Sequence, residues 1–197
     1  YKKGIILVNY DDSIQREKTS GIKTFSFGKS KKSNFLINNT TSNKSLCEAK
    51  FNNKKITSNL FGDYNYENIN ASIALGIHFG LSFEEIKIGI KNYVPKNNRS
   101  EMRKTKNNFL FVDSYNANPT SMEVSIQSFI KYKKVKKVLI LGDMYEIGKT
   151  TLIEHEKILN LIKKNKDLKV FLVGKIFNRL KFYSNKIYFF SDTIELI

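Results

Sequence analysis

Cysteine, proline and acidic residues are all scarce in this sequence. Among 197 residues there are one cysteine (Cys47), two prolines and 18 Asp or Glu, against 34 Lys or Arg. A lone cysteine excludes an internal disulfide and a cysteine-rich metal site, which fits a reducing compartment. No apolar run approaches the roughly 18 residues of a membrane helix, and the opening residues lack the apolar core and cleavage site of a signal peptide. We therefore expect a cytoplasmic protein without membrane insertion.

The net charge of +16 is the strongest compositional signal. Such a charge can indicate a nucleic-acid or other anionic partner. The lysines, however, are spread over the whole chain, without the aromatic motifs or zinc-finger spacing of nucleic-acid-binding modules. Lys, Asn and Ile are abundant together, as an AT-rich coding bias would produce. We do not expect a nucleic-acid partner.

The chain is long enough for one large or two modest domains. Its first third reads as short strands separated by polar residues: GIILVNY, KTFSF, NFLI, LCEAKF and KKITSNL. Helical periodicity then begins, with Ile69, Ile73 and Ile77 on one stripe. A second helix should start at Ser82, which forms a capping box with Glu85, and end before Pro95; its apolar face would carry Phe83, Ile86, Ile90 and Tyr93.

A polar segment, residues 94–108, is the candidate domain boundary. Beyond it, four apolar runs (FLFV, VLIL, VFLV and IYFF) alternate with helical stretches at 120–132, 150–165 and 176–182. Strands that are buried on both faces and separated by helices predict a mainly parallel sheet with helical crossovers. The fold class is therefore α/β: short strands and two helices, followed by a Rossmann-like domain.

The stretch DSYNANPTSM, residues 113–122, follows the first of these apolar runs. Pro119 suits a helix start, and Thr120 with Glu123 would form its capping box. Ligands of open α/β sheets bind beyond the carboxyl ends of the strands, where four polar side chains of this stretch would lie. An acid can accept from ribose hydroxyls, and amides can bind a peptide or a nucleotide. The candidate binding residues are Asp113, Tyr115, Asn116 and Asn118.

Two other features carry less functional weight. GDMYEIGKT, residues 142–150, resembles a phosphate-binding loop but has five residues instead of four between Gly142 and Gly148. We interpret it as a turn with Gly148 at a tight bend and Thr150 or Thr151 capping the next helix. His155 shares a face with apolar residues, so we expect it to be packed and hydrogen-bonded.

Several motifs together resemble one known family. DSYNANPTSM, then LGDMYEIG and EH, together with the upstream GDYNYENINASIALG and NNRSEM, are similar to the Mur ligase family. They match best its branch that adds D-alanyl-D-alanine to UDP-N-acetylmuramoyl-tripeptide in peptidoglycan precursor synthesis. The resemblance implies that residues 1–97 are the C-terminal part of the central ATP-binding domain. Residues 98–197 would be the family's C-terminal domain, incomplete at its end.

The same resemblance implies roles for individual residues. The family activates a peptide carboxylate with ATP as an acyl phosphate, which the incoming amine then attacks. Asn65 and Asn68 match the paired asparagines at the nucleotide, and Arg99 matches the catalytic arginine that reaches the ATP phosphates. Asp113 matches an acid that contacts the nucleotide. Tyr115, Asn116 and Asn118 would face the nucleotide and the dipeptide.

The sequence also departs from the family pattern. Tyr64 stands where many members have histidine. The phosphate loop, the lysine that helps to hold Mg²⁺ and the final KGS motif are absent from these 197 residues, so we expect Mg²⁺ ligands mainly upstream and an inactive isolated fragment of a monomeric enzyme. Alternatives remain: a sibling Mur or folylpolyglutamate-type ligase, a non-catalytic nucleotide-binding remnant, or a basic nucleic-acid binder.

Overall fold

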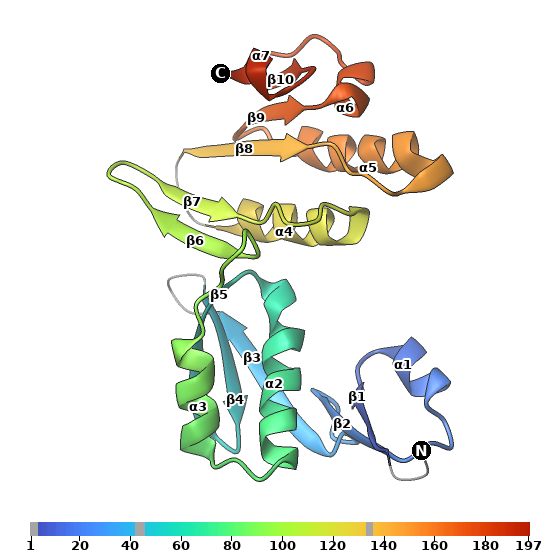
Figure 1. The fold of residues 1–197 in the computed structure, drawn as a ribbon, viewed down its shortest axis with the longest axis vertical. Helices are drawn as coiled ribbons and strands as arrows, with labels where there is room; N and C mark the ends of the chain where they lie inside the picture. Colours follow the sequence, from blue (N-terminus) through green and yellow to red (C-terminus); the bar gives the residue numbers. More distant parts are fainter. Residues whose placement is uncertain (1–3, 42–45, 133–135) are drawn as a thin grey trace. The chain divides into compact units, whose positions relative to one another are not determined.

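The computed structural model of the chain describes residues 4–41, 46–132 and 136–197. Contacts between Cα atoms divide it into two compact units, Tyr1–Val112 and Asp113–Ile197. Both units combine helices with sheets, as Figure 1 shows, so the predicted α/β class is confirmed. Each unit has its own hydrophobic core and is described separately.

The first unit contains a five-stranded sheet in the order β1-β2-β3-β4-β5. Its strands are β1 Ile6–Asn9, β2 Thr24–Gly28, β3 Phe35–Thr41, β4 Leu46–Phe51 and β5 Lys54–Phe61. The first three strands pair in parallel, and β3, β4 and β5 pair antiparallel. All five strands were predicted from the sequence. The short helix α1, Ser13–Lys18, was not predicted; the carboxylate of Asp12 caps it.

Two helices, α2 Tyr66–His78 and α3 Phe83–Asn92, supply the rest of this unit's core. Ile69, Ile73 and Ile86 are buried there, as the helical periodicity predicted. The predicted capping box at the start of α3 is confirmed, because Ser82 and Glu85 bond each other's backbone N–H groups. Tyr93 was wrongly placed on the apolar face: it follows the last turn of α3 and is exposed.

An antiparallel hairpin closes the first unit. It consists of β6 Glu101–Lys104 and β7 Phe109–Val112. Two predictions therefore need correction, because β6 lies in the segment expected to be a linker, and β7 pairs with β6 instead of joining the parallel sheet. The strand β7 leaves Phe109 and Leu110 exposed, whereas the ring of Phe111 packs 4.1 Å from that of Phe61 in β5.

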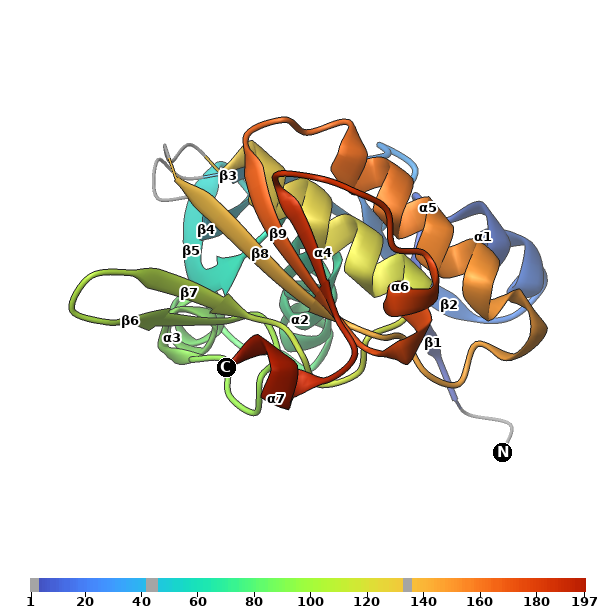
Figure 2. The ribbon, with the colours of Figure 1, turned by 90° about the horizontal axis from the view of Figure 1, so that it is seen from above.

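The second unit is built on a three-stranded parallel sheet, β10-β9-β8. Its elements are α4 Pro119–Lys131, β8 Lys137–Gly142, a 3₁₀ turn Gly148–Thr150, α5 Thr151–Lys163, β9 Leu168–Val173, α6 Lys175–Arg179, β10 Ile187–Phe190 and α7 Thr193–Leu196. Figure 2 shows the three strands running side by side. The predicted mainly parallel sheet is confirmed.

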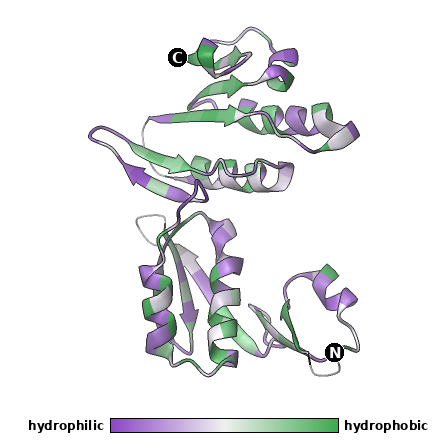
Figure 3. Cartoon of the chain, in the orientation of Figure 1, coloured by the Kyte–Doolittle hydropathy of each residue, from purple (hydrophilic) through white to green (hydrophobic). Residues whose placement is uncertain are grey.

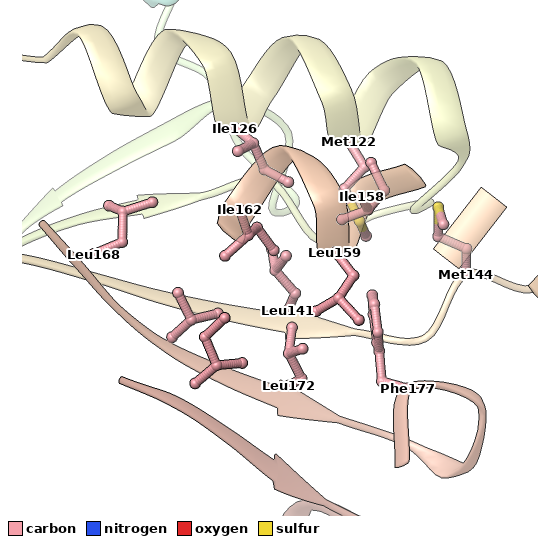
Figure 4. Packing of buried hydrophobic residues seen from close by; sticks show 12 residues of the cluster. Met122, Ile126, Leu141, Met144, Ile158, Leu159, Ile162, Leu168, Leu172 and Phe177 are labelled. Carbon is pink, nitrogen blue, oxygen red and sulfur yellow. The ribbon is translucent and has the colours of Figure 1, made fainter. Parts of the chain in front are cut away.

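Hydrophobic side chains from α4, α5 and the sheet form this unit's core (Figure 4), including Met122, Ile126, Ile158, Leu159, Ile162 and Leu172. Figure 3 shows β8 and β9 as mostly hydrophobic. The strands are not buried on both faces as predicted, because Val138 and Ile140 of β8 are 50% and 61% exposed. Among the described residues, no helix combines the length and apolar character needed to cross a bilayer.

Candidate functional site

The paired asparagines lie on a tight turn that follows β5. The 3₁₀ turn Asp63–Asn65 leads directly into α2. Asn65 is buried, and its amide donates to the carbonyl of Phe61 at 2.7 Å. Its side-chain oxygen accepts from the amide of Asn68 at 3.2 Å, so the structure brings both predicted residues together. Asn68 is an exposed residue.

Arg99 is exposed, and the next residue in the chain contacts the turn that carries the asparagines. Its neighbour Ser100 lies with its hydroxyl oxygen 2.9 Å from that of Tyr64. The two residues are 36 positions apart in the chain, and no local pattern in the sequence could have indicated the pairing. Arg99, Tyr64 and the asparagines thus belong to one region of the first unit.

The polar stretch of the second unit divides into two parts. Asp113, Tyr115 and Asn116 are exposed. Asn118 is the N-cap of α4: its side chain accepts from the N–H of Ser121 at 3.0 Å, and Ser121 accepts from the Asn118 N–H at 3.3 Å. Pro119 begins the helix as predicted, but the Thr120–Glu123 capping box was wrong. The helix begins earlier because Pro119 itself occupies its first turn.

The acids at the carboxyl ends of the parallel strands cap short helices. Asp143, after β8, is buried and accepts from the N–H groups of Ile176 and Phe177 at 2.8 and 2.9 Å. Asp192, after β10, accepts from the N–H groups of Ile194 and Glu195, and these bonds hold its pKa below the usual range. Both carboxylates already have internal partners, so they are weaker candidates for ligand binding.

His155 is buried, as predicted, and stabilises the loop after β8. Its Nε2 accepts from the N–H of Met144 at 2.9 Å, which places the ring proton on Nδ1, 2.7 Å from the carbonyl of Thr151. The ring also packs edge-on against Phe177. His155 therefore has a structural explanation that needs no ligand.

The loop that resembles a phosphate-binding loop is a turn. Gly148 has φ 75°, as a tight bend requires. Thr150 occupies the N-cap position of α5 without a capping bond from its side chain, and the hydroxyl of Thr151 donates to the carbonyl of Gly148 at 2.7 Å. Thr150 thus occupies the predicted N-cap position, but its side chain makes no capping hydrogen bond.

No metal site lies at these candidate residues in the ranges that the structure describes, and a pocket lies away from them. In the described part of the chain, no three His, Cys, Asp or Glu side chains come together as a metal site would require. A pocket of 430 Å³ lies by Asn165, Leu168 and Ile187, which begin or precede strands. It is therefore at the amino ends of the parallel strands, opposite to where ligands of such sheets bind.

An α/β unit built on a parallel sheet is an architecture that many nucleotide-binding proteins share. Two family models match the chain: the Mur ligase middle domain over residues 1–76, and the Mur ligase glutamate ligase domain over residues 98–195. The chain belongs to the Mur ligase family.

Individual relatives agree with this assignment. The chain is 28% identical over 204 residues to a UDP-N-acetylmuramoyl-tripeptide–D-alanyl-D-alanine ligase of Buchnera aphidicola, covering 100% of this chain and 44% of that relative. MurF of Acinetobacter baumannii shares the fold with a TM-score of 0.82 at 20% identity, over 99% of this chain and 44% of that one. MurF of Thermotoga maritima, crystallised with ADP, has a TM-score of 0.77 at 20% identity over 96% and 44%. The chain thus spans less than half the length of these relatives.

Proposed function

We propose that the full-length protein is an ATP-dependent ligase that joins D-alanyl-D-alanine to UDP-N-acetylmuramoyl-tripeptide. The observation that carries this proposal is the match along the whole chain to a relative named for that reaction. The nucleotide motif around Asn65 and Asn68 and the polar stretch at 113–118 support it. Because ATP and the UDP-linked substrate are cytoplasmic metabolites, we place the enzyme in the cytoplasm. We also propose that it is a monomer.

The proposed domain boundary falls at residues 97 and 98. The separate family matches at 1–76 and 98–195 support a central-domain portion followed by a C-terminal domain. Contacts between Cα atoms group the hairpin β6–β7 with the first unit and divide the chain after Val112. We therefore propose that the hairpin belongs to the C-terminal domain by descent and packs on the central-domain portion through Phe111 and Phe61.

The reaction would proceed in two balanced steps. A carboxylate oxygen of the tripeptide attacks the γ-phosphorus of ATP, and ADP leaves with the electrons of the broken P–O bond. The amine of D-alanyl-D-alanine then attacks the acyl carbon, phosphate leaves, and the amine loses a proton. Arg99 would stabilise negative charge on the transferring phosphoryl group with a planar cation. Within the residues that the structure describes, no three His, Cys, Asp or Glu side chains come together that could hold Mg²⁺.

We assign the remaining candidate residues by their chemistry. The side chain of the exposed Asn68, oriented by Asn65, would bind the nucleotide. Asp113 would accept from the ribose hydroxyls, and Tyr115 with Asn116 would contact the incoming dipeptide. Asn118 would act there mainly by fixing the start of α4, because its side-chain oxygen caps that helix.

Phosphate release by the full-length enzyme tests the proposal. We expect release from ATP to require both UDP-N-acetylmuramoyl-tripeptide and D-alanyl-D-alanine. Replacing the dipeptide with single amino acids or D-glutamate distinguishes a sibling ligase, and no release with any acceptor would indicate a non-catalytic remnant.

Arg99→Ala should lower kcat by about 100-fold or more, as loss of a charge-stabilising group does. Lys96→Ala removes a neighbouring exposed cation and should leave kcat unchanged. Full activity of Arg99→Ala would overturn the role of that arginine.

A further inference from the structure

The bond between Tyr64 and Ser100 connects two parts of the candidate site. Tyr64 directly precedes Asn65 of the asparagine pair, and Ser100 directly follows Arg99. Their hydroxyl oxygens are 2.9 Å apart, and both residues are half-buried. Tyr64 lies in the 3₁₀ turn before α2, and Ser100 lies in the bend that leads into β6.

The ring of Tyr64 lies close against the backbone of Gly62 in the preceding turn. Gly62 has φ 88°, and a Cβ on it would lie 2.4 Å from the Tyr64 ring, so only glycine leaves room for the ring there. The carbonyl of Gly62 accepts from the buried thiol of Cys47 at 2.9 Å and from the N–H of Asn65 at 3.0 Å. The backbone of the turn that precedes Tyr64 is thus held by hydrogen bonds to the buried Cys47 and Asn65.

The segment around Arg99 has an unusual backbone conformation and is held by hydrogen bonds on both sides. Positive φ values, which cost energy for residues other than glycine, occur at Asn97, Asn98 and Ser100. On one side, Arg103 holds the segment by donating to the side-chain oxygen of Asn98 at 3.1 Å and to the carboxylate of Glu101 at 2.7 and 2.9 Å. Tyr64 holds it at Ser100. Arg99 lies between these two fixed points, with its side chain exposed.

We propose that Tyr64 is a positioning residue for the reaction, acting through Ser100. Its hydroxyl fixes the backbone beside Arg99. The position of the Arg99 guanidinium relative to the asparagine pair therefore depends on this hydrogen bond. The inference rests on the proposed function and adds to it a role that depends on the hydroxyl of Tyr64. A preordered arginine loses less entropy when it meets the transferring phosphoryl group, which raises kcat more than it improves nucleotide binding.

Removing the two hydroxyls singly and together tests this role in the full-length enzyme. Tyr64→Phe keeps the ring, and we expect about a three- to tenfold lower kcat, as for one lost hydrogen bond, with KM for ATP changed less than about twofold. Ser100→Ala should have a similar effect, and the double variant should be no worse than either single variant. The exposed Tyr93→Phe, in the same unit, should match the wild type.

Each outcome decides the proposal. Additive losses in the double variant, or a Tyr64→Phe enzyme with normal kcat and only a lower Tm, would overturn it and leave Tyr64 with a structural role alone. Hydrogen exchange of the free enzyme gives a readout that needs no activity: Tyr64→Phe should speed exchange in residues 97–104 and leave 65–75 unchanged. If exchange behaves so but the wild type shows no dipeptide-dependent phosphate release, the contact is real and the proposed function is what fails.

Discussion

The carboxylate of Asp143 occupies the space beside Gly174 that any larger residue would need. A Cβ added to Gly174 would lie 2.2 Å from the carboxyl carbon of Asp143, and the φ of 134° there is itself unfavourable for other residues. The same carboxylate caps α6, so it cannot move away without losing two hydrogen bonds. Residue 174 is therefore restricted to glycine by a residue 31 positions earlier in the chain.

Gly174→Ala should lower the free energy of unfolding of the second unit by about 3 kcal/mol or more, from backbone strain and steric overlap. Urea denaturation followed by circular dichroism measures it. Gly142→Ala is the matched control at the end of β8, because a Cβ there meets nothing within 4 Å. Equal stability of the two variants would contradict this description of the Asp143 contact.

Asp143→Asn should destabilise the same unit by about 2 kcal/mol. An amide offers one acceptor where the carboxylate serves two N–H groups, and its NH₂ group would face a donor in a buried place. Asp192→Asn changes an exposed acid that caps α7, and asparagine caps an exposed helix nearly as well. We expect a clearly smaller loss for that control, measured by the same denaturation. If both variants lost similar free energies of unfolding, the burial of Asp143 would not make its cap stronger than that of Asp192.

Asn118→Ala should cost about 1 kcal/mol of stability, the usual price of an N-cap. Asn118→Asp keeps the capping oxygen and should therefore retain the stability of the wild type. Asn116→Ala removes an exposed amide and should leave the stability unchanged. Comparing KM for the dipeptide in these variants separates capping from binding. A stable Asn118→Asp enzyme with a greatly raised KM would show that Asn118 itself contacts the substrate.

Cys47 should resist alkylation in the folded protein. Burial, and secondly the nearby charge of Asp63, raise the pKa of its thiol from 9.0 to about 12, and only the thiolate reacts readily. Iodoacetamide at pH 8 should therefore label the peptide containing Cys47 in denaturant but not in buffer, as mass spectrometry can check. Rapid labelling in buffer would contradict the buried position.

The same shift predicts how stability depends on pH. The unfolded thiol releases its proton near pH 9, whereas the folded thiol keeps it up to about pH 12. The stabilisation is therefore complete below about pH 9 and is lost progressively as the pH rises toward 12. Between pH 8 and 10.5, the free energy of unfolding should fall more steeply for the wild type than for Cys47→Ala. Parallel curves would show that the thiol does not contribute.

Much of the fold follows from local sequence patterns. The five strands of the first unit, the helix stripe through Ile69 and Ile73, and the capping box of Ser82 and Glu85 were all predictable, because each depends on residues within one or two turns of each other. The start of α4 at Pro119 was predictable for the same reason. The N-cap was misplaced because Asn118, Thr120 and Ser121 all have capping side chains, and local rules do not decide among them.

Only part of the candidate site could be predicted from local sequence patterns. The motifs around Asn65, Arg99 and Asp113 are contiguous in sequence, and so the family resemblance could identify them. The pairing of β7 with β6, the glycine requirement at residue 174 and the bond between Tyr64 and Ser100 depend on which distant segments meet. The sequence by itself thus determined most helices and strands and the family motifs, because periodicity and short motifs depend on residues that are close together in the chain. Only the tertiary structure decided which hydroxyls, carboxylates and backbone groups become partners, because such contacts join residues whose separation leaves no periodic signal.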